Sequence, residues 1–430
     1  MPDLPNRSLE QIMEAGQSMT ALDRLEKIVA DGLCLGCGLC SAVAGPDALS
    51  FARDETGEPR PFAGPALDDA VMDLVYDICP GFNLEGLPHA LADAAAHNDL
   101  VWGPHMRLFQ AHAGDPHQRH VAATGGALTA LACQILESGE VGMVAHVRAA
   151  ADPPHFGEAT ISRTPQEVVA AAGSRYGPTA ALADIGTLLD GGVPFALIAK
   201  PCDLNAMRRL AHHDPRVNRL VRYWLAPVCG GYMPDAGFRQ FAARMGHDPD
   251  DVTGVRYRGH GCPGPTRIEH ADGSATEHHY LDVWGEDDSQ WVLPFRCKVC
   301  ADGIGEAADI AAADNWDGGA PTREGAKTDP GSNAVIIRTA TGDELAKAAL
   351  ASGRLVAEHD LLADDPSRMQ PHHVKKKLSG LARSRGMERA GSLAPRLFNM
   401  RAEALDEALG EEGRKAEEDG AARRTRQRRG

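Results

Sequence analysis

Three closely spaced cysteines form the sharpest chemical motif of this sequence. Cys34, Cys37 and Cys40 are separated by two residues each, and one glycine lies in each gap. Three thiolates at this spacing can hold three corners of a 4Fe-4S cluster, and glycine allows the backbone to bend tightly around it. We therefore predict an iron–sulfur site, because a structural zinc site typically uses two separated pairs of ligands.

The fourth ligand of this cluster must come from elsewhere in the chain. In the bacterial ferredoxin motif a fourth cysteine follows after three residues and precedes proline, but Ala44 occupies that position here. The nearest Cys-Pro pair is Cys79-Pro80, about forty residues further on. We expect Cys79 to complete the first 4Fe-4S cluster.

A second ligand pair lies far from the first. Cys297 and Cys300 form a CxxC pair, which alone fits zinc, a redox dithiol or a cluster. Two single cysteines, Cys202 and Cys229, each follow an apolar stretch that predicts a strand. Loops at the carboxyl ends of neighbouring parallel strands meet in space. These four cysteines could therefore form a second four-thiolate site, although spacing alone leaves the alternatives open. Of the two other cysteines, we interpret Cys133, on an apolar helix face, as a core residue, and Cys262, in a turn between Gly261 and Pro263, as incidental.

A glycine turn offers a candidate phosphate site. Thr124, Gly125 and Gly126 precede a predicted helix that has no acidic residue in its first turn. Free N–H groups at a helix N-terminus favour an anion, and glycine permits its close approach. The same turn would serve equally well as a simple helix cap.

Two further segments suit a nucleotide cofactor. Ser174, Arg175 and Tyr176 offer a hydroxyl, a guanidinium and an aromatic face within one turn. Lys200 follows the same predicted strand as Cys202 and could lie beside an anionic part of a flavin. The alternative for Lys200 is an ordinary surface lysine.

The elements that position these residues alternate between strand and helix from residue 106 onward. Apolar runs of strand length alternate with helix-like segments, an order that predicts parallel pairing in an α/β layer. The predicted strands are 106–114, 143–147, 193–200 and 221–228, and the predicted helices are 127–139, 179–190 and 203–213.

Residues 252–295 have a different pattern, with short strands joined by Gly, Pro and Asp turns. The strands predicted from here to residue 342 are 252–259, 266–273, 277–285, 308–314 and 333–342. The fold class that follows is an α/β core with an N-terminal iron–sulfur module, a β-rich insertion and a helical charged C-terminus.

Composition and charge exclude several classes of function. The 430 residues include 60 acidic and 44 basic side chains, a net charge of −16, which argues against nucleic acid as the main partner. No stretch approaches the ~20 apolar residues of a membrane span, and the N-terminus lacks the pattern of a signal peptide. We therefore expect a cytoplasmic protein whose grouped thiols serve metal or redox chemistry.

Together these motifs make the chain resemble the coenzyme F-420 hydrogenase/dehydrogenase beta-subunit family. That family includes the beta subunit of F-420-dependent formate dehydrogenase and 7-hydroxymethyl chlorophyll a reductase. The matching stretches lie in the family's order and are CLGCGLC (34–40), ICPG (78–81), ATGGALTAL (123–131), AGSRYGP (172–178), KPCDLNAMRRL (200–210), CGGYMPDAGFRQF (229–241), VRYRGHGCPG (255–264) and RCKVCADGIGEAADIAAADNW (296–316).

The resemblance implies an oxidoreductase that passes electrons between 4Fe-4S clusters and FAD, with hydride exchange at the flavin to coenzyme F-420 or a similar acceptor. It implies that Cys202, Cys229, Cys297 and Cys300 hold a second cluster. It also implies FAD contacts from Thr124, Gly125, Gly126, Ser174, Arg175, Lys200 and Pro201, with Asp314 and Trp316 on the flavin or substrate side. Three departures stand out: a cysteine-rich insert is absent, Lys200 replaces a common threonine, and the charged segment after residue 365 has no counterpart.

With this resemblance we divide the chain into five parts: a helical leader (1–32), an iron–sulfur module and linker (33–105), an α/β flavin-binding core (106–250), a β-rich part with the second cysteine pair (251–365), and a helical, partly disordered tail (366–430). Ferredoxin or another redox protein or subunit is the expected electron partner, and a small molecule the final acceptor or donor. The alternatives are a ferredoxin-dependent flavin reductase of a tetrapyrrole or other organic substrate, a non-catalytic relay subunit of a larger enzyme, and a zinc-stabilised binding module.

Overall fold

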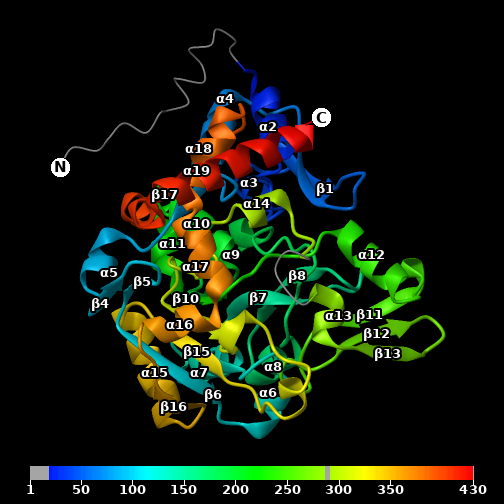
Figure 1. Ribbon diagram of the computed structural model, residues 1–430, viewed down its shortest axis with the longest axis vertical. Helices are drawn as coiled ribbons and strands as arrows, with labels where there is room; N and C mark the ends of the chain where they lie inside the picture. Colours follow the sequence, from blue (N-terminus) through cyan, green and yellow to red (C-terminus); the bar gives the residue numbers. More distant parts are fainter. Residues whose placement is uncertain (1–18, 286–290, 430) are drawn as a thin grey trace.

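An eight-stranded sheet forms the centre of the protein (Figure 1). The computed structural model describes residues 19–285 and 291–429. The strands follow one another across the sheet in the order β16-β6-β15-β14-β10-β9-β7-β8. Their bounds are β6 (Arg107–Ala113), β7 (Val144–Ala149), β8 (Gly157–Ser162), β9 (Phe195–Ile198), β10 (Val221–Pro227), β14 (Ile310–Asp314), β15 (Asn333–Ile337) and β16 (Leu355–Asp360).

The middle of this sheet is parallel and both sides are antiparallel. β7, β9, β10 and β14 run in one direction, whereas β8, β15, β6 and β16 pair antiparallel with their neighbours. Parallel pairing of the predicted strand 106–114 is therefore wrong, because β6 lies between two antiparallel strands that come later in the chain. The chain returns from β14 to β15 through 3-10 turns, η3 (Asp317–Gly319) and η4 (Gly325–Lys327), and not through the crossover helix that a parallel neighbour requires.

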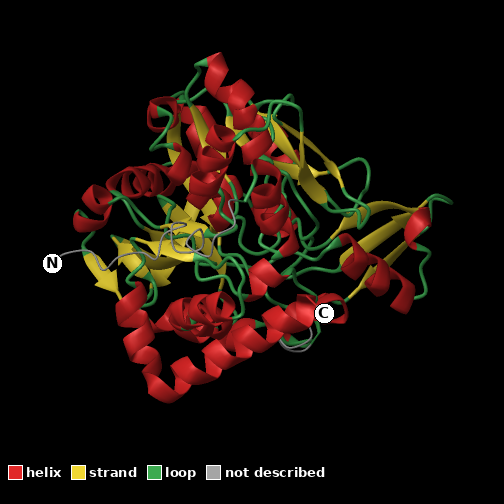
Figure 2. Cartoon of the chain, turned by 90° about the horizontal axis from the view of Figure 1, so that it is seen from above, coloured by secondary structure: helices red, strands yellow, loops and turns green. Residues whose placement is uncertain are grey.

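Buried side chains alternate between the two faces of the sheet, and helices cover both (Figure 2). Leu225 of β10 packs on one face with Leu131 and Leu345, and Trp224 packs on the other face with Leu204. The first face is covered by α7 (Ala127–Ser138), α8 (Pro165–Ala170) and α15 (Ala340–Ala351), and the second by α9 (Ile185–Gly191), α10 (Pro201–Leu210) and α11 (Pro215–Leu220). The predicted helix 179–190 begins later than expected, at Ile185.

The N-terminal part folds into a small module of short elements beside the sheet (Figure 1). α2 begins at a capping box formed by Thr20 and Asp23, and Leu25 and Ile28 bury its inner face. The leader prediction agrees with α2, while residues 1–18 lie outside the described residues. The elements are α2 (Ala21–Ala30), α3 (Leu39–Ala44), β1 (Leu49–Arg53), β2 (Pro59–Ala63), α4 (Asp69–Ile78), β3 (Asn83–Glu85), α5 (His89–Asp93), β4 (His97–Asp99) and β5 (Gly103–His105). α6 (Pro116–Val121) comes later, after β6 of the central sheet.

The β-rich part divides between two sheets. Three strands form an antiparallel sheet of their own, in the order β11-β12-β13, whereas the predicted strands 308–314 and 333–342 join the central sheet as β14 and β15. The strand predicted over 277–285 is wrong beyond His278, because His279 and Asp282 form a capping box that starts a helix. The elements are α12 (Asp235–Arg244), η1 (Pro249–Asp251), β11 (Val252–Arg256), β12 (Thr266–His270), β13 (Ala275–His278), α13 (Tyr280–Trp284) and α14 (Phe295–Lys298).

The C-terminal segment is helical and packs against the N-terminal module. The expected partial disorder is wrong for 402–429, which form α19, because its small apolar residues Ala421 and Ala422 are buried and its charges pair with α18. Arg383 binds Glu417 at 2.8 Å. The elements are α16 (Asp364–Met369), α17 (Pro371–Leu378), α18 (Gly380–Arg389), β17 (Arg396–Phe398) and α19 (Ala402–Arg429).

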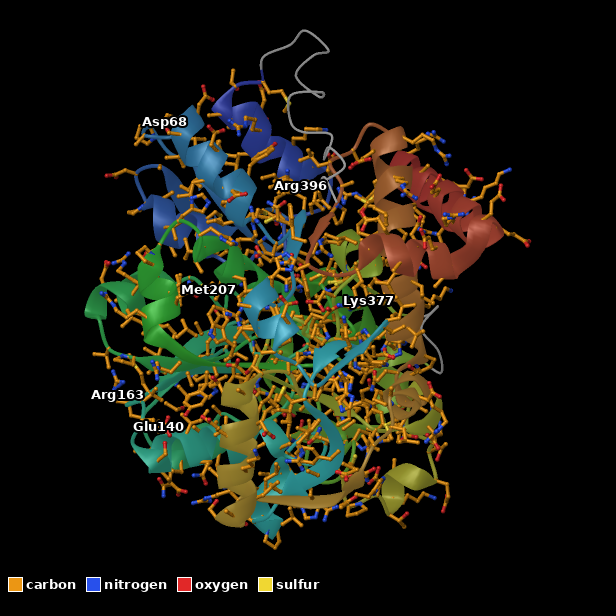
Figure 3. All side chains as sticks on the ribbon, turned by 90° about the vertical axis from the view of Figure 1, so that its left-hand side faces the viewer. Asp68, Glu140, Arg163, Met207, Lys377 and Arg396 are labelled. Atoms are coloured by element: carbon orange, nitrogen blue, oxygen red, sulfur yellow. The ribbon has the colours of Figure 1, made fainter. Side chains whose placement is uncertain are left out.

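Two contacts tie this segment to the rest of the protein. Lys377 on α17 forms a buried ion pair with Glu306, and Arg396 on β17 donates to the Asn83 side chain at 2.8 Å (Figure 3). β17 extends β3 as a parallel strand. The two ends of the chain therefore stabilise one another.

Candidate functional site

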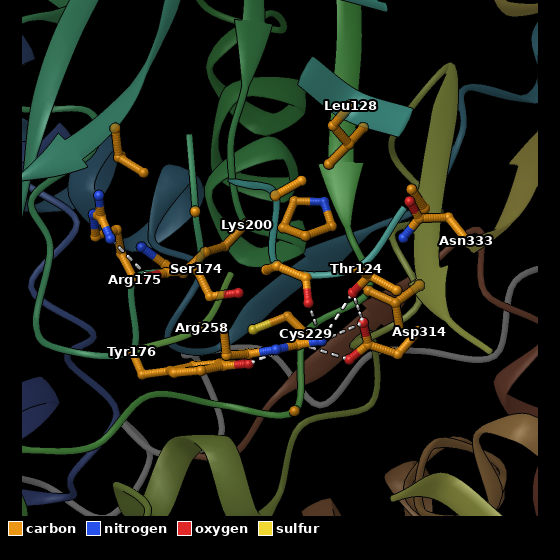
Figure 4. A pocket seen from close by; sticks show the side chains of 18 of the residues that line it. Thr124, Leu128, Ser174, Arg175, Tyr176, Lys200, Cys229, Arg258, Asp314 and Asn333 are labelled. Carbon is orange, nitrogen blue, oxygen red and sulfur yellow. Dashed lines mark hydrogen bonds and ion pairs between the residues drawn. The ribbon is translucent and has the colours of Figure 1, made fainter. Parts of the chain in front are cut away.

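A pocket opens at the carboxyl ends of the parallel strands, as expected for an α/β sheet. It is bordered by residues that follow β9, β10 and β14, by the N-terminus of α7, and by aromatic side chains of the β-rich part. We call it the main pocket (Figure 4). Eight of the ten predicted cofactor residues line it, namely Thr124, Gly126, Ser174, Arg175, Tyr176, Lys200, Asp314 and Trp316.

The two other predicted residues lie next to the main pocket without lining it. Pro201 is the first residue of α10. A Cβ atom on Gly125 would lie 2.6 Å from the Ser332 Cα atom, so this position accepts no side chain. Gly126 has a φ of 74° and caps α7, while the first N–H of the helix donates to the Asn333 side chain at 3.1 Å. The other N–H groups of the first turn are the ones that an anion could use.

Arg258 is a site residue that the sequence analysis missed. Its side chain is buried, and its guanidinium donates to Asp314 at 2.9 and 3.1 Å, to the Thr124 hydroxyl at 2.8 Å and to the Tyr176 hydroxyl at 3.0 Å. It also lies over the Trp316 ring at 4.7 Å. Four predicted residues thus converge on one unpredicted residue. The only signal was its place within VRYRGHGCPG, to which no role was attached.

Arg258 keeps its positive charge in this setting. Burial alone would lower the pKa of Arg258, but Asp314 and the nearby Tyr176 and Tyr280 hydroxyls raise it well above its ordinary value. The ion pair therefore gives the main pocket a stable donor array that stays protonated throughout the physiological range.

Arg175 contrasts with Arg258, because no carboxylate pairs with it among the residues that the structure describes. Its Nη1 atom donates to the Ser174 carbonyl at 3.0 Å, and its buried Nε atom has no hydrogen-bond partner within that part of the chain. Burial lowers the pKa of Arg175. An unpaired guanidinium in the wall of a pocket suits a phosphate group, which would supply the missing acceptor.

Aromatic side chains form one side of the main pocket. Tyr176 contacts Trp284 with ring centroids 4.8 Å apart, Trp284 contacts Trp291 at 6.4 Å, and Trp291 contacts His372 at 5.1 Å. Edge-to-face contacts of this kind leave ring faces available for stacking on a planar ligand. The pocket can therefore hold a flat conjugated ring system against this wall.

The first cysteine group consists of Cys34, Cys37, Cys40 and Cys79, and all four line a second, apolar pocket in the N-terminal module. Burial raises the pKa of Cys40 and of Cys79 to about 12, and the Cys34 thiol adds to both shifts. Thiols in such a setting keep their protons unless a metal replaces them. The lining is otherwise apolar, as expected for a buried iron–sulfur cluster.

Local backbone geometry brings these thiols together. Gly36 and Gly38 have φ values of 64° and 86°, so the loop between α2 and α3 turns in a way that other residues rarely adopt. Cys79 reaches the same pocket as the C-cap residue of α4. Cys79 and Pro80 therefore line the same pocket as the three closely spaced cysteines.

The second cysteine group consists of Cys202, Cys229, Cys297 and Cys300, which the fold also brings together. Burial raises the pKa of Cys229 to about 12, with further contributions from the Cys297 and Cys300 thiols. Burial likewise raises the pKa of Cys202, helped by Asp203 and Cys229. Cys229 is also part of the wall of the main pocket. The loops that follow β9 and β10 therefore lie beside the CxxC pair.

The two cysteine groups lie close to one another. Asp203 is near enough to raise the pKa of both Cys37 and Cys202, after the larger effect of burial. Burial raises the pKa of Tyr232, which lines the main pocket, and the Cys297 and Cys34 thiols add to this shift. Both groups thus lie near Asp203 and Tyr232, and the second group also borders the main pocket through Cys229.

The described residues, 19–285 and 291–429, form no cluster of three or more ligands around a single ion, whereas four thiolates around zinc would each lie about 2.3 Å from the ion. Cys133 is buried in the core and Cys262 lies in a turn, apart from both groups.

Comparison with known proteins gives two family matches. Residues 108–185 match the model of the coenzyme F-420 hydrogenase/dehydrogenase beta subunit N-terminal region, and residues 194–360 match that of its C-terminal region. A chain in a solved structure of the F-420-reducing nickel–iron hydrogenase complex from Methanosarcina barkeri is 19% identical, with 61% of this chain and 84% of that chain covered and a TM-score of 0.48. No curated protein matches the chain. None of the helices that the structure describes is both long and apolar enough to cross a membrane.

Proposed function

Because this chain belongs to the coenzyme F-420 hydrogenase/dehydrogenase beta-subunit family, we propose that it is an iron–sulfur flavoprotein with two 4Fe-4S clusters and FAD. It would relay electrons between the clusters and the flavin, with hydride exchange at the flavin to coenzyme F-420 or a similar acceptor. An oxidoreductase role in electron transfer follows from the family. The cofactors and the acceptor are the proposal.

The observation that carries the proposal is the proximity of two four-thiol groups to each other and to one pocket. The first group opens into an apolar pocket of its own, and the second contributes Cys229 to the wall of the main pocket. Eight thiols in two sets of four match the ligand demand of two 4Fe-4S clusters. A flavin in the main pocket would lie next to the second set.

The residues of the main pocket fit FAD chemically. Arg175 and the first turn of α7 offer donors without acidic partners, which suits the pyrophosphate. Arg258, held by Asp314, presents a fixed cation near the aromatic wall, where the flavin ring would stack and be shielded from water. FAD, when bound, would couple one-electron transfer to two-electron hydride transfer.

A partner protein is expected at the first cysteine group. Cys34 and Cys40 are partly exposed, whereas Cys37 is buried, so electrons can enter or leave the protein on this side. Ferredoxin or another redox subunit would dock here. The same geometry would serve a flavin reductase of a tetrapyrrole or another conjugated substrate, because the aromatic wall selects for planarity and not for one ring system.

The first experiment is anaerobic purification with iron, sulfide, zinc and flavin measured on one sample. About eight iron and eight sulfide with one FAD per chain would support the proposal. About four iron would remove the second cluster from it, and zinc without iron or flavin would contradict it altogether.

Turnover assays then separate an enzyme from a relay subunit. The purified protein would be tested with coenzyme F-420, ferredoxin and a nicotinamide nucleotide. Reduction of F-420 by the protein alone supports the enzyme. Full cofactor content without turnover, together with copurification of a catalytic chain, favours a relay subunit.

A further inference from the structure

A buried ion pair lies where the two cysteine groups meet the main pocket. The Lys200 Nζ atom and the Asp203 Oδ2 atom are 2.9 Å apart, and the Asp203 side chain is fully buried. Apart from this ion pair, neither carboxylate oxygen of Asp203 has a hydrogen-bond partner in the part of the chain that the structure describes. A buried pair with so few other contacts contributes little to stability, so its value must lie elsewhere.

The two charges share most of their neighbours. Lys200 lines the main pocket and interacts with the Cys202 and Cys229 thiols of the second group, and its Nζ atom also lies 3.5 Å from the Thr179 carbonyl oxygen. Asp203 acts on Cys202 and also on Cys37 of the first group. Both ends of the pair therefore line the main pocket, on either side of Cys202 in the sequence, and they act on the same second group with opposite charge.

We propose that Lys200 and Asp203 set the reduction potentials along the path from the first cysteine group to the main pocket. An added electron increases negative charge, so a fixed cation nearby stabilises the reduced form and a fixed anion destabilises it. Lys200 makes the second cluster and the flavin easier to reduce, and Asp203 makes both clusters harder to reduce. This inference rests on the proposed function.

The inference predicts that substitutions of Lys200 and of Asp203 shift the midpoint potentials in opposite directions. Midpoint potentials of the wild type, Lys200→Met, Asp203→Asn and the double variant would be measured by anaerobic titration with mediators, using electron paramagnetic resonance for the clusters and visible absorbance for the flavin. We expect Lys200→Met to weaken reduction of the second cluster about tenfold, or about 59 mV for one electron, and to lower the flavin potential. Asp203→Asn should raise the potentials of both clusters, and the double variant should lie between the single variants.

Two further variants control for structural damage. Lys347 pairs with Asp343 on α15 in the same way, at 2.6 Å, but its side chain is 64% exposed, so Lys347→Met should leave every potential unchanged. Lys200→Arg keeps the charge and should keep the potentials. If Lys200→Met loses iron, Lys200→Gln takes its place.

The possible outcomes separate the inference from the proposed function. A wild-type protein without a second cluster or flavin contradicts the proposed function itself. A wild-type protein with its full cofactor content, whose potentials stay constant in both single variants or shift in the same direction in both, overturns the inference alone.

Discussion

The guanidinium of Arg258 holds both carboxylate oxygens of Asp314, at 2.9 and 3.1 Å, in the wall of the main pocket. The two residues are 56 positions apart in the sequence and come from two different sheets: Arg258 follows β11, and Asp314 ends β14 of the central sheet. Their ion pair fastens the β-rich part to the core at the point where a cofactor would bind.

Replacement of Arg258 by lysine tests this role. Lysine keeps the charge but cannot make the forked contact with Asp314, Thr124 and Tyr176. We expect FAD affinity to fall about tenfold to a hundredfold, because one or two charge-assisted hydrogen bonds are lost. Titration of the FAD-free protein, followed by flavin fluorescence, measures the change.

Arg256→Lys is the matched control for that variant. Arg256 lies two residues earlier, on β11, and bonds the Gly259 carbonyl at 3.1 Å and Glu277 at 3.3 Å, outside the main pocket. It should bind FAD like the wild type. Equal losses in both variants would show that the damage is general and not specific to Arg258.

Cys37→Ala should remove the first cluster and leave the flavin in place. Cys37 belongs to the group in the N-terminal module, which has its own pocket apart from the main one. We expect about four of eight irons to be lost, with FAD content unchanged, as measured by iron assay and absorbance. Cys133→Ala, in the core of α7, should lose no iron. Loss of all flavin together with the first cluster would contradict two separate sites.

Cys229→Ala should affect the second cluster and the flavin together. This thiol belongs to the second group and also lines the main pocket, so we expect about four irons to be lost and reduction of the bound flavin through the first cluster to slow at least tenfold. Stopped-flow absorbance measures the reduction rate. Cys262→Ala is the control, since that residue lies in a turn. A normal reduction rate in Cys229→Ala would exclude a relay through the second group.

Gly386→Ala should destabilise the packing of the two C-terminal helices. A Cβ atom at this position would lie 2.2 Å from the carbonyl oxygen of Glu418, so α18 and α19 would have to separate. We expect a loss of about 1–3 kcal/mol in the free energy of unfolding, measured by urea denaturation. Gly191→Ala on α9 meets no atom within 4 Å and should be neutral or slightly stabilising. An unchanged midpoint for Gly386→Ala would mean that α19 does not pack this closely in solution.

His146 should make the protein less stable in acid. Burial lowers the pKa of His146 to about 4, below the ordinary value near 6.5. Between these two values the unfolded chain binds a proton that the folded protein does not, so the free energy of unfolding falls as the pH drops from about 6.5 to 4. The loss reaches about 3 kcal/mol at most. His146→Gln removes this titration, and unfolding curves at several pH values should then show a shallower slope; an identical slope would contradict the assignment.

Local patterns were sufficient for much of the fold. Short apolar runs predict β6, β7, β9 and β10 within a few residues, because a buried strand is recognisable from its own apolar composition. The pattern fails at 277–285, where the capping box of His279 and Asp282 starts a helix. It also fails in the C-terminal segment. The composition there suggests disorder, but charged residues of α19 form ion pairs with α18.

The candidate site likewise has parts that local patterns predict and parts that they do not. The spacing of Cys34, Cys37 and Cys40 is a local property, so the grouping of these three thiols could be predicted from the sequence. The family resemblance extended this to the second set and to most residues of the main pocket. Arg258 escaped notice, because an arginine in a glycine-rich turn carries no local sign of its partners.

Only the tertiary structure decided how these parts meet. The order of strands brings the ends of β9 and β10 beside the CxxC pair, which lies about seventy residues further on, and no local spacing encodes that order. The same holds for the Lys200–Asp203 pair, which the fold places in the wall of the main pocket. The spacing of ligands within one motif is decided by covalent distance along the chain. Burial, charge pairing and the placement of one site beside another depend on packing between segments that are far apart in the chain.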